Sequence, residues 1–176
     1  MNWLYDLSDR IIKNYDLHDL PTLVLHHVGH EESFGLKKAA YFIDNPDFNH
    51  FQGIAGFTTS ECKLHHPTLW KSPTSFNENK KTARFHKSVE QFADESLSKK
   101  SKISPESKLK KIAKELGLTS FDFFSWTLKY GNTAFLLFES GKKLSKQEKE
   151  LLEHAVSYLS FCPTNRRSVQ KDKTPW

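Results

Sequence analysis

The strongest fold signal in this sequence is in the last third of the chain, where two strands and a capped helix follow one another. Residues 121–128 alternate between aromatic and polar side chains, which is the pattern of a strand with one buried face. The turn Lys129-Tyr130-Gly131-Asn132 leads into a strand over 133–139. Its residues 134–138 are apolar on both faces, so this strand is expected to be central in a sheet. Ser145 and Glu148 have the spacing of a capping box. The sequence thus predicts an antiparallel hairpin followed by a helix.

Two helices are predicted at the beginning of the chain. Apolar residues at spacings of three and four indicate a helix over 2–15. Asp19 is expected to cap a second helix that runs to about Gly35. Residues 22–28 also suit a strand, and this alternative stays open because Gly29 interrupts the helical pattern.

A second hairpin and an irregular segment follow. Strands over 38–44 and 48–57 flank Asn45-Pro46-Asp47, a typical turn sequence. Residues 58–81, rich in Pro, Ser, Thr and Asn, are expected to form a loop. A helix is predicted over 82–97, with Phe85, Val89, Phe92 and Ala93 on one face.

The clearest helix of the middle segment covers 105–116, with Ser104 as its cap. Together these elements predict an α+β fold, with a mostly antiparallel central sheet and the N- and C-terminal helices on one face. One domain is expected over 1–162, with a long, lysine-rich, irregular and helical middle segment at 58–120, followed by a basic flexible tail at 163–176.

Composition supports a single folded domain. The chain has 176 residues, and its 14 Phe, 5 Tyr and 4 Trp supply a core despite a hydrophobic fraction of only 37%. No apolar run approaches the roughly 18 residues of a membrane span, and the N-terminal segment lacks the apolar region of a secretory signal. Cys62 and Cys162 are too few for a disulfide framework. We therefore expect a cytoplasmic protein with reduced thiols.

Positive charge is concentrated in the middle of the chain. The net charge is +5, and the segment from Lys63 to Glu115 contains 13 Lys/Arg but only 6 Asp/Glu. A nucleic-acid-binding regulator using the helix at 105–116 is one alternative, because LKKIAKELGLT is similar to the first helix and turn of a helix-turn-helix. The next residues, 121–126, alternate like a strand instead of forming a recognition helix. A solvated helix explains the lysines equally well, so we expect no retention of duplex DNA at about 0.15 M salt.

Nine histidines suggest a second alternative, a histidine-based metal-binding protein. His26, His27 and His30 are clustered, and His26 and His30 share the i,i+4 spacing of paired zinc ligands. The HExxH motif of zinc proteases is missing, since Phe34 occupies the position of its second histidine. The sequence also contains no GxSxG, GxxxxGK[ST] or GxGxxG motif. Neither catalysis nor a resident metal is therefore expected.

Three segments resemble a GAF domain, a sensory module of signalling proteins. LYDLSDRIIKNYDLHDLPTLVL is similar to its opening helices, KKAAYFIDNPDFNHFQGIAGF to its first hairpin, and FFSWTLKYGNTAFLLFESGKKLSKQEKELLEHAVSYLSF to its closing hairpin and helix. The resemblance implies a sensory or regulatory role with a small molecule as the usual input, acting on a separate signalling partner. It also implies homodimerisation through the terminal helices, for which Trp3, Ile12, Tyr158 and Phe161 are the extra apolar residues. The signature of cyclic-nucleotide-binding members is absent, so the ligand stays unknown.

The same resemblance implies a ligand pocket on the sheet face beneath the middle segment. Tyr41 with Ile43, and Trp126 with its neighbours at 124 and 128, are expected to form stripes on adjoining strands. Aromatic residues of the middle segment would act as lids, and His50 and Tyr41 would be the polar groups. The candidate pocket residues are Tyr41, His50, Trp70, Phe85, Phe124 and Trp126.

Overall fold

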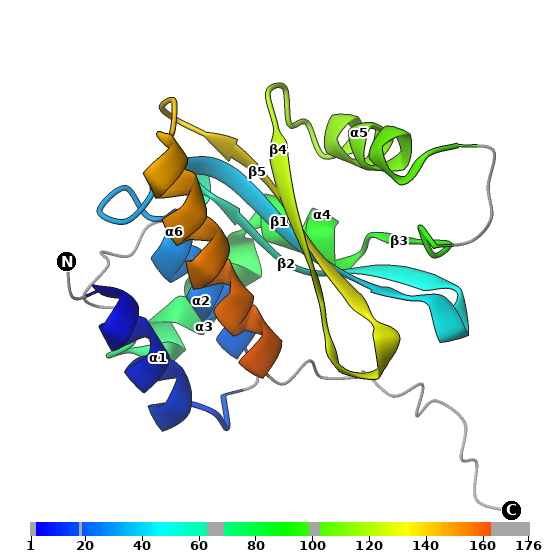
Figure 1. Ribbon diagram of the computed structural model, residues 1–176. Coiled ribbons are helices and arrows are strands. Elements are labelled where there is room, and N and C mark those ends of the chain that lie inside the picture. Colours follow the sequence, from blue (N-terminus) through cyan, green and yellow to red (C-terminus); the bar gives the residue numbers. More distant parts are fainter. Residues whose placement is uncertain (1–2, 18, 63–68, 99–102, 163–176) are drawn as a thin grey trace, which may run out of the picture.

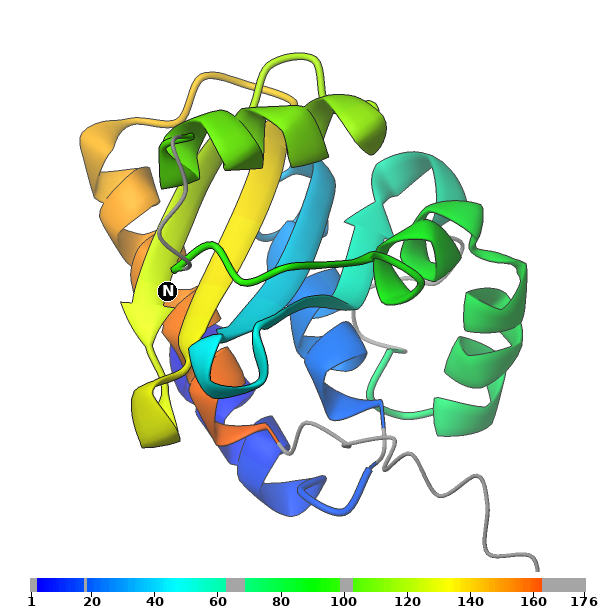
Figure 2. The ribbon, with the colours of Figure 1, turned by 90° about the vertical axis from the view of Figure 1, so that its right-hand side faces the viewer.

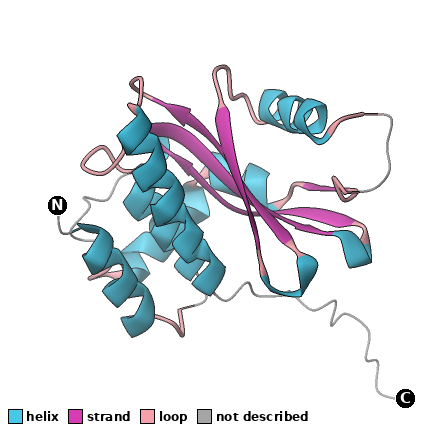
Figure 3. Cartoon of the chain, viewed as in Figure 1, coloured by secondary structure: helices cyan, strands magenta, loops and turns pink. Residues whose placement is uncertain are grey.

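A computed structural model describes residues 3–17, 19–62, 69–98 and 103–162. Its centre is a five-stranded antiparallel sheet with strand order β3-β2-β1-β5-β4 (Figure 1). Six α-helices surround this sheet on its two faces (Figures 1 and 3). The expected α+β class and the antiparallel character of the sheet are therefore confirmed. The tail at 163–176 lies outside the described residues.

Both predicted hairpins are present and are joined side by side. The first pairs β1 (Leu36–Asn45) with β2 (His50–Thr58), and the second pairs β4 (Asp122–Thr127) with β5 (Thr133–Ser140). β1 pairs with β5 from Leu36 opposite Ser140 to Asp44 opposite Thr133. Each of these two strands is therefore paired on both sides, which confirms the central position predicted for β5 from the two-sided apolar pattern of residues 134–138.

The terminal helices cover one face of the sheet. α1 (Trp3–Lys13), α2 (Leu20–Gly29) and α6 (Lys146–Ser157) pack there on a core that includes Leu136 and Phe138 of β5. Every residue of α2 is buried, so the helix has no solvent face, which explains why its apolar pattern also suits a strand. α2 ends at Gly29 instead of near Gly35, since His30 has a non-helical backbone conformation (ψ 150°). The absence of a side chain at Gly29 lets the Phe57 ring of β2 pack directly against the end of the helix.

The opposite face is covered by the middle segment (Figure 2). α4 (Arg84–Glu90) and α5 (Pro105–Glu115) pack there on a second core that contains Phe42, Phe51 and Leu137. The α4–β2 contact is close, since a Cβ at Gly53 would lie 1.7 Å from the backbone oxygen of Val89. Glycine at this position is what allows the helix to lie directly on the strand.

Two predictions for the middle segment are wrong. Part of the predicted loop at 58–81 is α3 (Pro73–Thr82), whose Phe76 is buried against Leu23 and Leu69. The helix predicted over 82–97 is only α4, because β3 (Ala93–Asp94) pairs with Phe51 and Gln52 at the sheet edge. Both elements depend on contacts with distant residues, which a local pattern does not contain.

Two of the three predicted side-chain caps are confirmed; Asp19 stands at the N-cap position of α2, but its side chain makes no capping hydrogen bond. The Ser104 hydroxyl accepts a hydrogen bond from the Ser107 N–H at the start of α5. Ser145 and Glu148 form the reciprocal capping box of α6. Within the described ranges, no helix combines the length and the apolar character needed to cross a bilayer.

Candidate functional site

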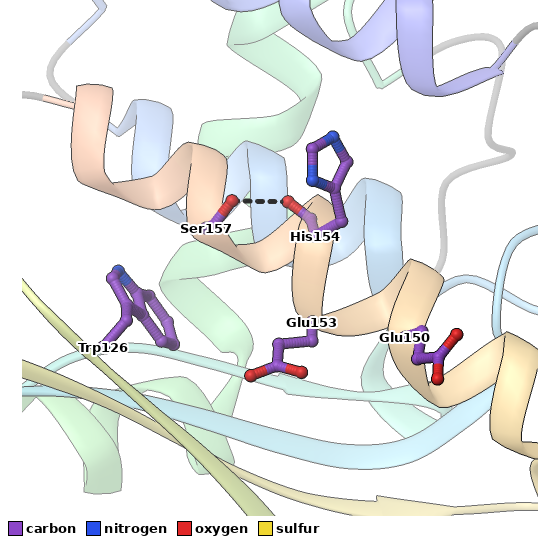
Figure 4. A pocket seen from close by; sticks show the side chains of 5 residues that line it. All are labelled: Trp126, Glu150, Glu153, His154 and Ser157. Carbon is purple, nitrogen blue, oxygen red and sulfur yellow. Dashed lines mark hydrogen bonds between the residues drawn. The ribbon is translucent and has the colours of Figure 1, made fainter.

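A groove of about 360 Å³ lies between the edge strand β4 and α6 (Figure 4). The strand contributes Trp126, and the helix contributes the other lining residues, Glu150, Glu153, His154 and Ser157. The four helix residues are spaced by three, one and three positions, so they follow one side of the helix. The volume falls in the range of small-molecule sites.

Trp126 is held in one orientation. Its ring stacks on the ring of Tyr41, with centroids 5.9 Å apart and planes 3° from parallel. Its Nε1–H donates a hydrogen bond of 2.8 Å to the Ser160 hydroxyl, just beyond α6. The indole N–H is therefore already used, and the half-buried ring offers mainly its aromatic surface to the groove.

Tyr41, the ring on which Trp126 stacks, is completely buried. Among the described residues its hydroxyl has no hydrogen-bond partner. Burial, and to a smaller extent Cys162, raises the pKa of this hydroxyl well above its ordinary value, so it stays protonated. Burial likewise raises the pKa of the Cys162 thiol to about 12, which makes it a poor nucleophile.

Two lysines near the groove form ion pairs with carboxylates outside its lining. Lys149 Nζ lies 2.6 Å from the Asp122 carboxylate, and Lys142 Nζ lies 2.7 Å from Glu148. The Lys142 hydrogen bond and the Ser145 N–H lower the pKa of the Glu148 carboxyl to about 2. These lysines are thus engaged with carboxylates that do not line the groove.

The imidazole and hydroxyl of the groove have other contacts. The His154 ring lies edge-on to Tyr158, with centroids 5.5 Å apart. The Ser157 hydroxyl donates a hydrogen bond of 2.6 Å to the His154 backbone oxygen (Figure 4). What the groove offers a ligand is therefore an aromatic surface next to two carboxylates.

The six predicted pocket residues do not come together. Tyr41 and Trp126 are in contact, and Phe124 lies on the same sheet face, stacked on Phe138. Trp70 donates a hydrogen bond to His27 of α2, and Phe85 lies on the opposite sheet face. His50 is the first residue of β2, next to the turn of the first hairpin, and pairs with Asn45.

The strands that carry Tyr41 and Trp126 were expected to be neighbours in the sheet, and they are not. β1 and β4, which carry Tyr41 and Trp126, do not adjoin, because β5 lies between them. On β5, Leu136 lies opposite Tyr41 and Ala134 lies opposite Trp126, and the two large rings stack across this strand. The groove lies on the face of the terminal helices and not beneath the middle segment. The helix residues of the groove were missed, because the sequence does not show that α6 lies beside the edge strand β4.

The clustered histidines are part of the core. His26 Nδ1 lies 3.0 Å from the Thr22 backbone oxygen, and its ring packs edge-on against Phe57 and Phe76. The Trp70 indole N–H donates to His27 Nδ1 at 3.1 Å. In the described part of the chain, no three His, Cys, Asp or Glu side chains are grouped so as to hold a metal ion.

Two of the four lysines of helix α5 lie near carboxylates of the same helix. Lys110 lies 3.5 Å from Glu106, and Lys111 lies 3.8 Å from Glu115. The segment that follows α5 is the strand β4, so no recognition helix follows, as expected from the alternation at 121–126. Lys99, Lys100 and Lys102 lie outside the described residues.

Comparison with known proteins gives no relative: no family model matches the chain, and neither the curated proteins nor the solved structures contain a match.

Proposed function

We propose that this chain is a sensory or regulatory module that binds a small molecule and has no catalysis of its own. In this proposal it is arranged like a GAF domain, works in the cytoplasm and acts on a separate signalling partner. The antiparallel sheet with the terminal helices on one face supports the proposed likeness to a GAF domain. The absence of nucleophile and phosphate-loop motifs from the sequence supports a binding role.

The observation that carries this proposal is the groove beside Trp126. Its aromatic wall is fixed from behind by Tyr41 and from the side by Ser160, so a ligand meets a preformed surface. The face beneath the middle segment, where the resemblance puts the ligand, is filled by Phe42, Phe51 and other core residues. We therefore assign the ligand to the β4–α6 groove.

Ligand binding at this groove would also provide an output. A bound molecule touches the sheet through Trp126 and α6 through Glu150 and Glu153. If two positions of α6 against the sheet differ in how well they hold the ligand, binding shifts the population between them. The end of α6 is followed by Phe161, which is 65% exposed and available to a partner.

A thermal-shift screen with nucleotides, amino acids and amines tests the proposal. We expect at least one compound to raise the melting temperature of the wild type and to protect the amides of α6 from hydrogen exchange. Trp126→Ala should abolish this effect. Because Trp126 is half-buried, the substitution should cost less than the roughly 3–5 kcal/mol of a fully buried tryptophan.

The matched control is Trp70→Ala, since Trp70 is also half-buried but does not line the groove. This variant should keep the ligand effect. A ligand that stabilises the Trp126→Ala protein as much as the wild type would refute the groove as the site. A broad screen without any stabilising compound would refute ligand sensing.

A further inference from the structure

The carboxylates of the groove are not balanced by nearby lysines. Glu153 makes no hydrogen bond or ion pair with any other described residue. Glu150 has Lys146 at 3.9 Å, but the two side chains are 64% and 91% exposed, so this pair contributes little. Lys149 and Lys142 are held by Asp122 and Glu148. The lining of the groove therefore carries two carboxylates and no Lys or Arg side chain.

The aromatic wall of the same groove favours positive charge as well. The negative face of an indole ring attracts cations, and tryptophan is the best of the aromatic residues for this contact. Trp126 cannot turn its N–H towards a ligand anion without losing Ser160, and Tyr41 fixes the plane of its ring. A fixed π surface, two carboxylates and a volume of about 360 Å³ thus occur together.

We propose that the groove binds a small organic ammonium group, with the cation over the Trp126 ring and beside Glu153, whose carboxylate points toward that ring (Figure 4). This inference rests on the proposed function and names the ligand class of the same site. A primary ammonium gains mostly from the carboxylates, whereas a methylated ammonium, which is easier to desolvate, gains mostly from the ring. A free amine and a methylated lysine side chain of a partner present the same chemistry.

The test is an NMR titration that follows the indole N–H signal of Trp126, identified by its loss in Trp126→Phe. The probes are choline, its neutral isostere 3,3-dimethylbutan-1-ol, and a capped tripeptide with a central trimethyllysine, all at constant ionic strength. We expect choline or the peptide to shift the signal saturably and the neutral alcohol to leave it unchanged. The tighter of the two cations identifies the source of the ammonium group.

Charge variants complete the test. Glu153→Gln and Glu150→Gln together should raise the Kd by about tenfold. Glu115→Gln on α5, an exposed carboxylate on the other side of the sheet, should leave the Kd unchanged. The inference is overturned if the alcohol binds as well as choline, or if the double variant keeps the wild-type Kd.

The outcome also separates this inference from the proposed function. A neutral or anionic compound that shifts Trp126 while both cations fail would refute the ammonium assignment and leave ligand sensing intact. If no compound of the screen shifts Trp126, both proposals fail.

Discussion

His26 shows how this core accommodates a polar side chain. The imidazole is almost completely buried between Phe57 and Phe76, with Nδ1 3.0 Å from the Thr22 backbone oxygen. Burial lowers its pKa from 6.5 to about 3, and the nearby charges of His86, His30 and Lys80 act in the same direction. His26 is therefore a neutral, hydrogen-bonded core residue at physiological pH.

This shift predicts a pH dependence of stability. The unfolded chain takes up a proton on His26 near pH 6.5, whereas the folded protein resists it until about pH 3. The contribution of neutral, buried His26 to the free energy of unfolding is fully present above pH 6.5. It is lost as the pH falls from 6.5 towards 3, by up to about 1.4 kcal/mol per pH unit. Urea unfolding of the wild type and His26→Gln at several pH values should give a shallower dependence for the variant. Equal slopes would contradict the assignment, and the exposed control His154→Gln should keep the wild-type slope.

At the scale of the elements, Asp44 connects the central sheet to the middle segment. Its carboxylate, at the end of β1, is 1% exposed. It accepts hydrogen bonds from the Ser96 hydroxyl, the Leu97 N–H and the Ser98 hydroxyl at distances of 3.1–3.2 Å. These bonds hold the segment that follows β3 against the second core, to which Leu97 belongs.

Removal of this carboxylate should loosen that segment. Asp44→Ala leaves three donors in or near the core without their acceptor, so we expect a loss of about 2–4 kcal/mol in the free energy of unfolding. Hydrogen exchange should also increase over residues 93–98. Asp47→Ala, at the exposed turn after β1, is the control and should change stability by less than about 0.5 kcal/mol. A similar small change for Asp44→Ala would disprove the connecting role.

The elements that the sequence predicts are those whose signals are local. Both hairpins carry alternation and turn residues, and α5 and α6 carry their own caps, so their existence does not depend on distant contacts. α3 contributes Phe76 as its buried side chain, and β3 consists of two residues paired with β2. Tertiary contacts define these elements, and a single sequence does not show such contacts.

The candidate site also contains residues that local sequence patterns indicate and residues that only the tertiary structure brings together. Strand alternation predicts that Trp126 shares a face of the sheet with Phe124, and that Tyr41 shares one with Ile43, but it does not identify the helices that cover that face. Glu150 and Glu153 become part of a groove only because α6 crosses beside the edge strand β4. That crossing follows from the packing of α6 on the core, so the acidic character of the site needed the structure.

At the scale of the whole molecule, the terminal helices leave apolar side chains on the surface. Ile12 near the end of α1 is 74% exposed, and Phe161 after α6 is 65% exposed. Tyr158 is half-buried, and the side chain of Trp3 lies outside what the structure describes. Both helices lie on the same side of the sheet (Figure 1). Exposed apolar residues of this kind often mark an interface, so we keep the prediction of a homodimer through the terminal helices.

Light scattering after size-exclusion chromatography tests this prediction. We expect the wild type to have a mass near twice the 20.4 kDa of one chain. The double variant Ile12→Glu/Phe161→Glu should have the mass of one chain. In a two-fold symmetric dimer each substitution is present in both subunits, so each buries two unpaired carboxylates at the interface. Phe48→Glu is the matched control: Phe48 is also 74% exposed but lies at the turn of the first hairpin, away from the terminal helices. It should leave the dimer intact. A wild-type protein of one-chain mass at the highest concentration reached, or a dimer that dissociates in Phe48→Glu and persists in the double variant, would show that the terminal helices do not form the interface.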